Sequence, residues 1–154
     1  MKNLKFSRLF AAMMFVACLV LTGCKPAKDP TAAKAIEGTW VSSYGEKYVI
    51  TSTDYDNYYK DSLSYSTNNV KIVEIDNKSG FVYGQFDDEA HIGYGAKLGQ
   101  WYALYYSDLT SSSVKLYQPY KADGKAACDS LDEAKAEYTW ENNYFAGYSE
   151  CTKQ

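Results

Sequence analysis

The chain has 154 residues, with 19 acidic against 16 basic residues and a formal net charge of −3. Arg8 is the only arginine, and arginine is the residue best suited to bidentate contacts with phosphate and guanine. This composition argues against nucleic-acid binding, and the length suits one compact domain.

The first 23 residues have the pattern of an export signal. Lys2, Lys5 and Arg8 make the start of the chain positive, and an apolar run follows from residue 9 to residue 21. That run is too short to span a bilayer comfortably and has the length of a signal-peptide core. A single transmembrane anchor is the alternative, as is a signal cleaved without any role for Cys24.

Residues 21–24 follow the apolar run with the sequence Leu-Thr-Gly-Cys. This stretch resembles the lipobox of bacterial lipoproteins, in which a signal peptidase cuts before a cysteine that carries a diacylglycerol. The resemblance implies removal of residues 1–23 and acylation of Cys24 with palmitate-type chains, and two or more chains give a stable membrane anchor. Because Lys25, not aspartate, follows the cysteine, we expect attachment to the outer membrane of the cell envelope.

Loss of the signal leaves 131 residues with 13 lysines, 19 acidic residues and a net charge of −6. Of the four cysteines, Cys18 leaves with the signal and Cys24 is the lipidation site. The remaining pair, Cys128 and Cys151, is predicted to form a disulfide, because exported domains with an even number of cysteines usually bridge them. The alternatives are two buried free thiols or a reactive thiol.

Residues 24–37 are predicted to be a lipidated tether. Pro26 and Pro30 interrupt regular structure, and the stretch has little apolar surface to bury. The folded domain is predicted over residues 38–154.

From residue 38 to about residue 120, short apolar strands alternate with turns. The expected strands cover residues 40–42, 47–51, 54–60, 62–66, 70–75, 81–86, 101–106 and 113–117. The clearest hairpin joins residues 70–75 to 81–86 through the turn at 76–80. Residues 87–99 are predicted to form a loop.

A helix is predicted after this strand region. Ser130-Leu-Asp-Glu133 has the form of a capping box. Leu131, Ala134 and Tyr138 then share one helical face, which predicts a helix of about ten residues. Residues 144–148 are predicted to return as the last strand.

Many short strands and one late helix predict a mainly β fold, a small antiparallel β-barrel with a C-terminal α-helix. Gly38-Thr39-Trp40 is similar to the Gly-X-Trp motif of lipocalins, whose tryptophan packs across the closed end of the barrel. The resemblance implies a lipocalin-like barrel. The arginine that often packs on that tryptophan in lipocalins has no counterpart in this domain.

A second resemblance covers most of the chain after the signal. The arrangement from Gly38-Thr-Trp through Gly99-Gln-Trp-Tyr to Leu131-Asp-Glu-Ala and Cys151 resembles small lipoproteins of spirochaetes such as Treponema. It supports export and lipidation and implies no specific activity.

Few residues indicate catalysis. His91 is the only histidine, and no serine or cysteine lies in a recognisable nucleophile motif. The acidic groups at residues 54–61 and 87–89 offer oxygen ligands without the spacing of a known calcium loop. We therefore expect no enzyme activity, no metal site and no cofactor.

Tyrosine is the unusual feature of the composition. All 16 tyrosines lie beyond the signal, and tyrosine combines an apolar ring with a polar hydroxyl. In residues 101–106 aromatic side chains fall on both faces of the strand, so either Trp101 and Tyr105 or Tyr102 and Tyr106 must face outward. Such outward rows bind sugars, small hydrophobic molecules or proteins, although tyrosine also serves as ordinary barrel filling.

The leading hypothesis is a non-enzymatic binding domain whose barrel holds a small hydrophobic ligand against Trp40, Trp101, Tyr102 and Tyr106. The alternative is a filled barrel whose outer aromatic surface engages a glycan or a protein of the envelope or host. A cavity of a few hundred cubic ångströms inside the barrel would favour the first hypothesis, and a filled interior the second.

Overall fold

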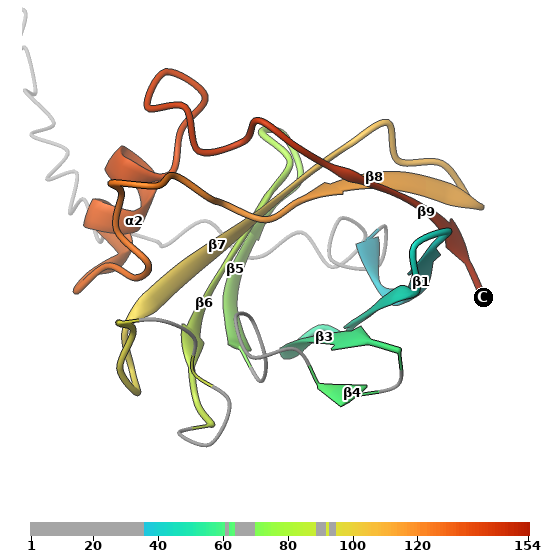
Figure 1. Ribbon diagram of the computed structural model, residues 1–154, viewed down its shortest axis with the longest axis horizontal. Helices are drawn as coiled ribbons and strands as arrows, with labels where there is room; N and C mark the ends of the chain where they lie inside the picture. The colour runs from blue at the N-terminus through green and yellow to red at the C-terminus, as the bar shows by residue number, and fades with distance from the viewer. Residues whose placement is uncertain (1–35, 61, 64–69, 89–91, 93–94) are drawn as a thin grey trace, which may run out of the picture.

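The computed structural model describes residues 36–154, except residues 61, 64–69, 89–91 and 93–94 (Figure 1). The predicted signal, the lipidation site Cys24, most of the tether and His91 therefore lie outside the described residues. Within the described part, no helix has the length and apolar character needed to cross a bilayer.

Eight of the nine strands in the described residues close into an antiparallel barrel (Figure 1). The eight are β1 (Gly38–Ser42), β2 (Glu46–Ile50), β3 (Asp54–Tyr59), β5 (Val70–Asp76), β6 (Phe81–Phe86), β7 (Trp101–Ser107), β8 (Ser113–Tyr117) and β9 (Ser149–Lys153). The two-residue β4 (Ser62–Leu63) pairs with the end of β3. Each barrel strand pairs with the next one in the chain, and β9 pairs with β1 to complete the ring. The predicted mainly β barrel is confirmed.

The hairpin predicted at residues 70–86 is present as β5 and β6. Its turn is fixed by Asp76, whose carboxylate accepts hydrogen bonds from the backbone N–H groups of Lys78 and Ser79 and from the Ser79 hydroxyl. The hydroxyl bond holds the pKa of Asp76 below its usual value, because it favours the charged carboxylate. This turn also forms one wall of the candidate functional site.

Trp40 is fully buried in the barrel interior, and its indole N–H donates to the carbonyl of Ile36 at 2.8 Å. The ammonium of Lys153, on the last strand, lies 5.0 Å from the Trp40 ring centroid and donates to the carbonyl of Glu37. A lysine from β9 therefore supplies a cation over this tryptophan. The sequence analysis did not identify it, because the two residues are far apart in the chain.

The buried side chains form two clusters on opposite faces of the barrel wall. Alternate residues of β7 separate them: Tyr102, Leu104 and Tyr106 belong to the interior cluster, whereas Ala103 belongs to the outer one. The outer cluster is completed by buried residues of β6, β8 and the chain that follows β8, namely Tyr83, Tyr117, Cys128, Ala134, Tyr138, Tyr144 and Phe145. The segment between β8 and β9 thus covers part of the outside of the barrel.

The helix α2 (Leu131–Glu137) lies in this covering segment and is shorter than predicted. Ser130 is its N-cap, with the side-chain oxygen accepting from the Glu133 N–H at 3.1 Å. The predicted cap is confirmed, although the Glu133 carboxylate accepts from the N–H of Asp129 and not from that of Ser130. The helix stops at Glu137 because the Asn142 amide donates to the carbonyls of Ala136 and Glu137.

Two expectations about the C-terminal region are wrong. Residues 144–148 do not form a strand: Tyr144 and Phe145 are buried in the outer cluster, and β9 begins at Ser149. Cys128 and Cys151 are both free thiols. Cys128 packs in the outer cluster and Cys151 in the interior cluster, so the barrel wall lies between them and the predicted disulfide is not formed.

Candidate functional site

Three of the four residues predicted to contact a ligand, Trp40, Tyr102 and Tyr106, belong to the interior cluster, and Trp101 does not. Trp40 and Tyr102 are both buried in that cluster. Trp101 packs on the outside, against the outer cluster. Tyr106 lies at the rim of the barrel, where its side chain lines a pocket.

Aromatic rings span the barrel interior. The ring of Tyr55 stacks on Tyr48 at 6.3 Å and on Tyr102 at 6.5 Å between centroids, and Phe86 lies 5.5 Å from Tyr102. Burial raises the pKa of Tyr102 well above its ordinary value, because the dry interior disfavours the phenolate. The Tyr102 hydroxyl is itself buried without a hydrogen-bond partner among the described residues.

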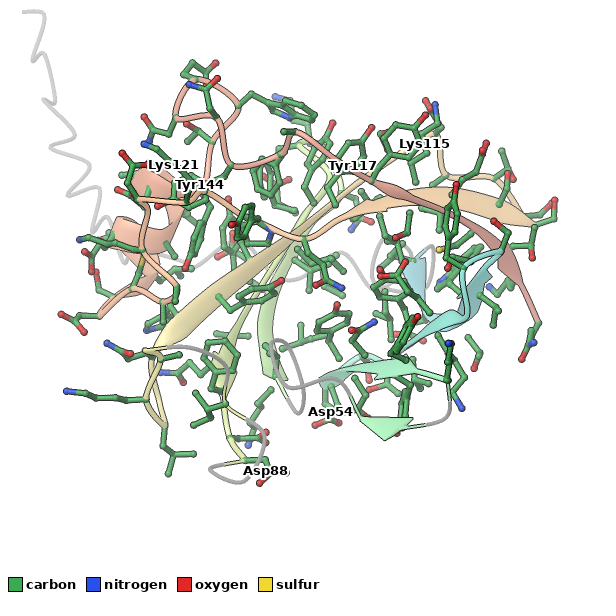
Figure 2. The ribbon with its side chains drawn as sticks, viewed as in Figure 1. Asp54, Asp88, Lys115, Tyr117, Lys121 and Tyr144 are labelled. Atoms are coloured by element: carbon green, nitrogen blue, oxygen red, sulfur yellow. The ribbon has the colours of Figure 1, made fainter. Side chains whose placement is uncertain are left out.

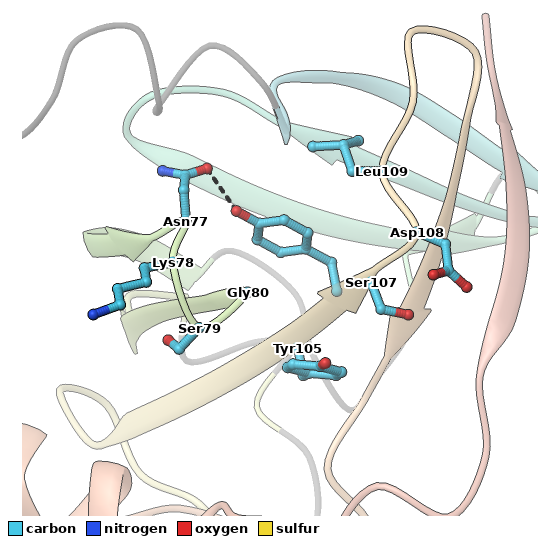
Figure 3. Close-up of a pocket in the computed structure, with 9 residues that line it drawn as sticks. Asn77, Lys78, Ser79, Gly80, Tyr105, Ser107, Asp108 and Leu109 are labelled. Carbon is cyan, nitrogen blue, oxygen red and sulfur yellow. Dashed lines mark hydrogen bonds between the residues drawn. The ribbon is translucent and has the colours of Figure 1, made fainter.

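A pocket with a volume of about 340 Å³ opens at the rim of the barrel, between the β5–β6 turn and the end of β7 (Figure 3). We call it the rim pocket. Its lining residues are Asn77, Lys78, Ser79, Gly80, Tyr105, Tyr106, Ser107, Asp108 and Leu109. Amide, hydroxyl and charged groups thus share the walls with two aromatic rings and one leucine.

Gly80 allows the turn to approach β7 this closely. Its φ is +78°, and a Cβ at this position would lie 2.4 Å from the carbonyl oxygen of Tyr106. The Tyr106 N–H donates to the Gly80 carbonyl at 2.8 Å, and the Tyr106 hydroxyl donates to Asn77 at 2.6 Å (Figure 3). Burial raises the pKa of Tyr106 to about 12, so this hydroxyl keeps its proton to a higher pH than an exposed tyrosine does.

A row of three aromatic rings lies on the outer surface next to the rim pocket. The row consists of Tyr117, Trp140 and Tyr148, and we call it the aromatic platform. Trp140 and Tyr148 are 46% and 53% exposed. The ring centroid of Tyr117 lies 5.4 Å from that of Trp140 and 5.3 Å from that of Tyr148, so Tyr117 holds both exposed rings in place.

Two residues of the rim pocket contact the aromatic platform directly. Tyr105 lines the pocket, and its ring lies 5.4 Å from that of Trp140. Ser107 also lines the pocket, and its hydroxyl lies 3.4 Å from the Tyr117 hydroxyl.

An ion pair makes a further link between the two. Asp108, on the pocket wall, pairs with Lys115 at 2.8 Å, and the Lys115 ammonium lies 5.0 Å from the Tyr148 ring centroid. Figure 2 shows Lys115 and Tyr117 on β8, on the side of the molecule away from Asp54 and Asp88. Pocket and platform therefore form one continuous surface.

The acidic groups considered for calcium lie only partly within the described residues. Among the residues described, no three histidine, cysteine, aspartate or glutamate side chains gather as a metal site would require. Asp54 accepts hydrogen bonds from the hydroxyls of Thr51 and Thr53 and so stabilises a local turn. Asp61 and Glu89 lie outside the described residues.

Sequence analysis missed Trp140 and Tyr148 as site residues. The sequence predicts Tyr148 in a strand over residues 144–148 that the structure does not contain, and no motif singles out Trp140. Both lie in the loop between α2 and β9. Tyr144 and Phe145 lie in the same loop and are buried, so the sequence of the loop does not indicate which of its aromatic rings are exposed.

Comparisons with protein-family models, with curated proteins and with solved structures find no match. Function must therefore be inferred from the chemistry of the site itself.

Proposed function

We propose that this protein is a lipid-anchored, non-enzymatic binding protein of the bacterial cell envelope, and that its ligand binds at the rim pocket and the aromatic platform. The observation that carries the proposal is the continuity of the pocket, of about 340 Å³, with the exposed rings of Trp140 and Tyr148. Pockets of this size are at the small end of those that hold ligands.

The platform has the properties of a binding surface. Aromatic side chains dominate the energetics of recognition, because each offers a large contact area with few rotatable bonds. Trp140 packs against Tyr105, Tyr117 and Phe145, and its ring is therefore already positioned before a ligand arrives. A preorganised ring loses little conformational entropy on binding.

The membrane partner and the location are proposed from the sequence. The lipobox-like residues 21–24 follow a basic start and an apolar core, and the resemblance to spirochaete lipoproteins supports the same anchor. In this proposal acylated Cys24 attaches the protein to the outer membrane, and the tether lets the barrel stand away from the lipid.

The absence of catalysis is likewise a proposal from the sequence. A single histidine and the lack of a nucleophile motif leave no recognisable set of base, nucleophile and orienting group. The net negative charge and the missing arginines support a partner other than nucleic acid.

A second function is favoured by one observation in the barrel interior. The buried Tyr102 hydroxyl has no hydrogen-bond partner among the described residues, and an unsatisfied buried hydroxyl costs about 1–3 kcal/mol. A small hydrophobic ligand with one acceptor atom would accept a hydrogen bond from the Tyr102 hydroxyl. The protein would then be a carrier that holds its ligand inside the barrel.

Mass spectrometry of the full chain, made in a bacterial host that processes lipoproteins, tests the anchor. We expect loss of residues 1–23 and the added mass of a diacylglycerol on Cys24. A Cys24→Ser chain is the control and should keep the signal. An unmodified Cys24 in the processed protein would contradict the anchor.

Native mass spectrometry of the lipidated protein, mixed with an envelope extract, then separates the two sites. An adduct lost in Tyr148→Ala but kept in Tyr102→Phe supports the surface site. The opposite pattern supports the carrier and rejects the surface site.

A further inference from the structure

We infer that the rim pocket and the aromatic platform together bind a neutral oligosaccharide built of pyranose rings. This inference rests on the proposed function and names the chemical class of its ligand. Four features support a neutral oligosaccharide as the ligand. They are the openness of the rim pocket to solvent, the pairing of the charged groups at the site, the pairing of the strands that carry it and the exposed rings of the aromatic platform.

The accessibility of the rim pocket argues against a purely apolar ligand. Hydrophobic ligands bind where most of their surface leaves water, whereas this pocket is open to solvent and its walls carry Asn77, Ser79 and Ser107. A sugar fits both properties, because its hydroxyl groups tolerate water and its C–H faces pack on aromatic rings.

The charges at the site favour a neutral ligand. Asp108 and Lys115 neutralise each other through their ion pair. The Asp76 carboxylate is engaged by the Ser79 hydroxyl and by backbone N–H groups of its own turn. Lys78 alone adds a cation at the pocket wall, and one exposed lysine is a weak anion site compared with the clustered bidentate donors that phosphate or sulfate groups select.

Strand pairing argues against an extended peptide. Peptides often bind by adding a strand to a free sheet edge. The strands that carry the site, β6, β7 and β8, are each paired with a strand on both sides. The backbone groups that an added peptide strand would need are therefore already used.

The platform geometry suits consecutive sugar rings. Trp140 and Tyr148 both contact Tyr117, so one buried ring separates the two exposed ones. Lys115 lies over one face of the Tyr148 ring. One sugar unit can stack its C–H face on the ring of Trp140 or Tyr148. The neighbouring unit can then enter the rim pocket past Tyr105, where the Ser107 hydroxyl and the Asp108 carboxylate offer hydrogen bonds.

The chain provides a closely matched control at Tyr59. Tyr59 is 50% exposed, against 53% for Tyr148, and the Lys60 ammonium lies 5.2 Å from its ring centroid, against 5.0 Å for Lys115 over Tyr148. Tyr59 is on β3, which is separated from β8 by three strands in either direction around the barrel. Tyr59→Ala therefore removes an exposed ring that has a lysine above it, as Tyr148→Ala does, but at a place distant from the rim pocket and the aromatic platform.

The test uses the full lipidated chain in a detergent without a sugar headgroup. An array of neutral trisaccharides of glucose, galactose, mannose and N-acetylglucosamine, together with sialylated and sulfated oligosaccharides, is screened first. The neutral trisaccharide bound best is then titrated by calorimetry against the parent, Tyr148→Ala, Trp140→Ala and Tyr59→Ala.

We expect binding of a neutral trisaccharide that Tyr148→Ala and Trp140→Ala each weaken by about tenfold or more, the effect of truncating an aromatic hot spot. Tyr59→Ala should leave it unchanged. Tyr148→Ala is the decisive variant, because Trp140 also contacts Phe145 in the outer cluster. Thermal unfolding of each variant identifies any loss of fold.

Three results would overturn the inference. The first is binding of charged oligosaccharides only, and the second is neutral-sugar binding that Tyr148→Ala leaves intact. The third is that no neutral sugar binds, whereas an envelope protein or lipid binds to the parent and not to Tyr148→Ala. In that case the inference about sugars is wrong, but the proposed function of the surface still holds. If no envelope component binds in a Tyr148-dependent way, the proposed function fails as well.

Discussion

At the scale of single residues, Gly80 controls the shape of the rim pocket. A Cβ added there would clash with the carbonyl oxygen of Tyr106 at 2.4 Å, and the φ of +78° is itself unfavourable for alanine. We expect Gly80→Ala to lower the free energy of unfolding by more than about 1 kcal/mol. The measurement is urea unfolding followed by circular dichroism.

The control for this prediction is Gly99→Ala. Gly99 has a similar φ of +80°, but no atom lies within 4 Å of a Cβ placed there. Alanine therefore brings the backbone strain without the clash. If both variants lose the same stability, the close approach of the turn to β7 is not important.

The two free thiols give a second prediction at this scale. Burial raises the pKa of Cys151 to about 12 and also raises that of Cys128, so few reactive thiolates form at neutral pH. With Cys24 acylated, neither thiol should react with Ellman's reagent in the native protein, and two should react in denaturant without a reductant. Denatured protein with no reactive thiol would instead reveal a disulfide.

At the scale of secondary structure, helix α2 depends on its N-cap. Ser130→Ala removes the acceptor for the Glu133 N–H, whereas Ser130→Asp keeps an acceptor at the same place. We expect the alanine variant to lose about 1 kcal/mol of stability and the aspartate variant to lose much less. Chemical unfolding measures both, and equal losses would mean that the cap contributes little.

Structural elements that are stabilised by residues close together in the chain could be predicted from the sequence. The β5–β6 hairpin and the Ser130 cap each depend on residues within a few positions of one another, so their patterns are visible in the printed chain. The Lys153 contact with Trp40 and the separation of Cys128 from Cys151 depend on how distant strands meet. The spacing of residues along the sequence does not predict contacts between strands that are far apart in the chain.

The same limit applies to the residues of the candidate site. The sequence identified Tyr106 and the aromatic richness of β7, and the structure places Tyr106 in the rim pocket. It did not identify Trp140 and Tyr148, because their positions depend on how the covering segment folds over β7 and β8. Exposure of a loop ring is a property of packing, which a local pattern does not contain.

At the scale of the whole molecule, buried tyrosines link stability to alkaline pH. Burial is the main cause that raises the pKa of Tyr83, Tyr106 and Tyr144 to about 12, whereas tyrosine in an unfolded chain ionises near pH 10. Between these values the folded protein binds more protons than the unfolded chain, so stability falls as pH rises. The stabilising effect is complete below about pH 10 and is lost by about pH 12.

We therefore expect base-induced unfolding in this pH range. Phenolate absorbance at 295 nm should rise together with the loss of the β-sheet circular dichroism signal. Phenolate absorbance from all 16 tyrosines with an unchanged β-sheet signal would contradict this account.

Strand β9 completes the ring of the barrel. Because β9 lies between β8 and β1, a chain that lacks its final residues leaves two open strand edges and an exposed apolar interior. Such an intermediate is prone to aggregation and proteolysis. The closed barrel, and every site built on it, therefore forms only once β9 has paired with both β1 and β8.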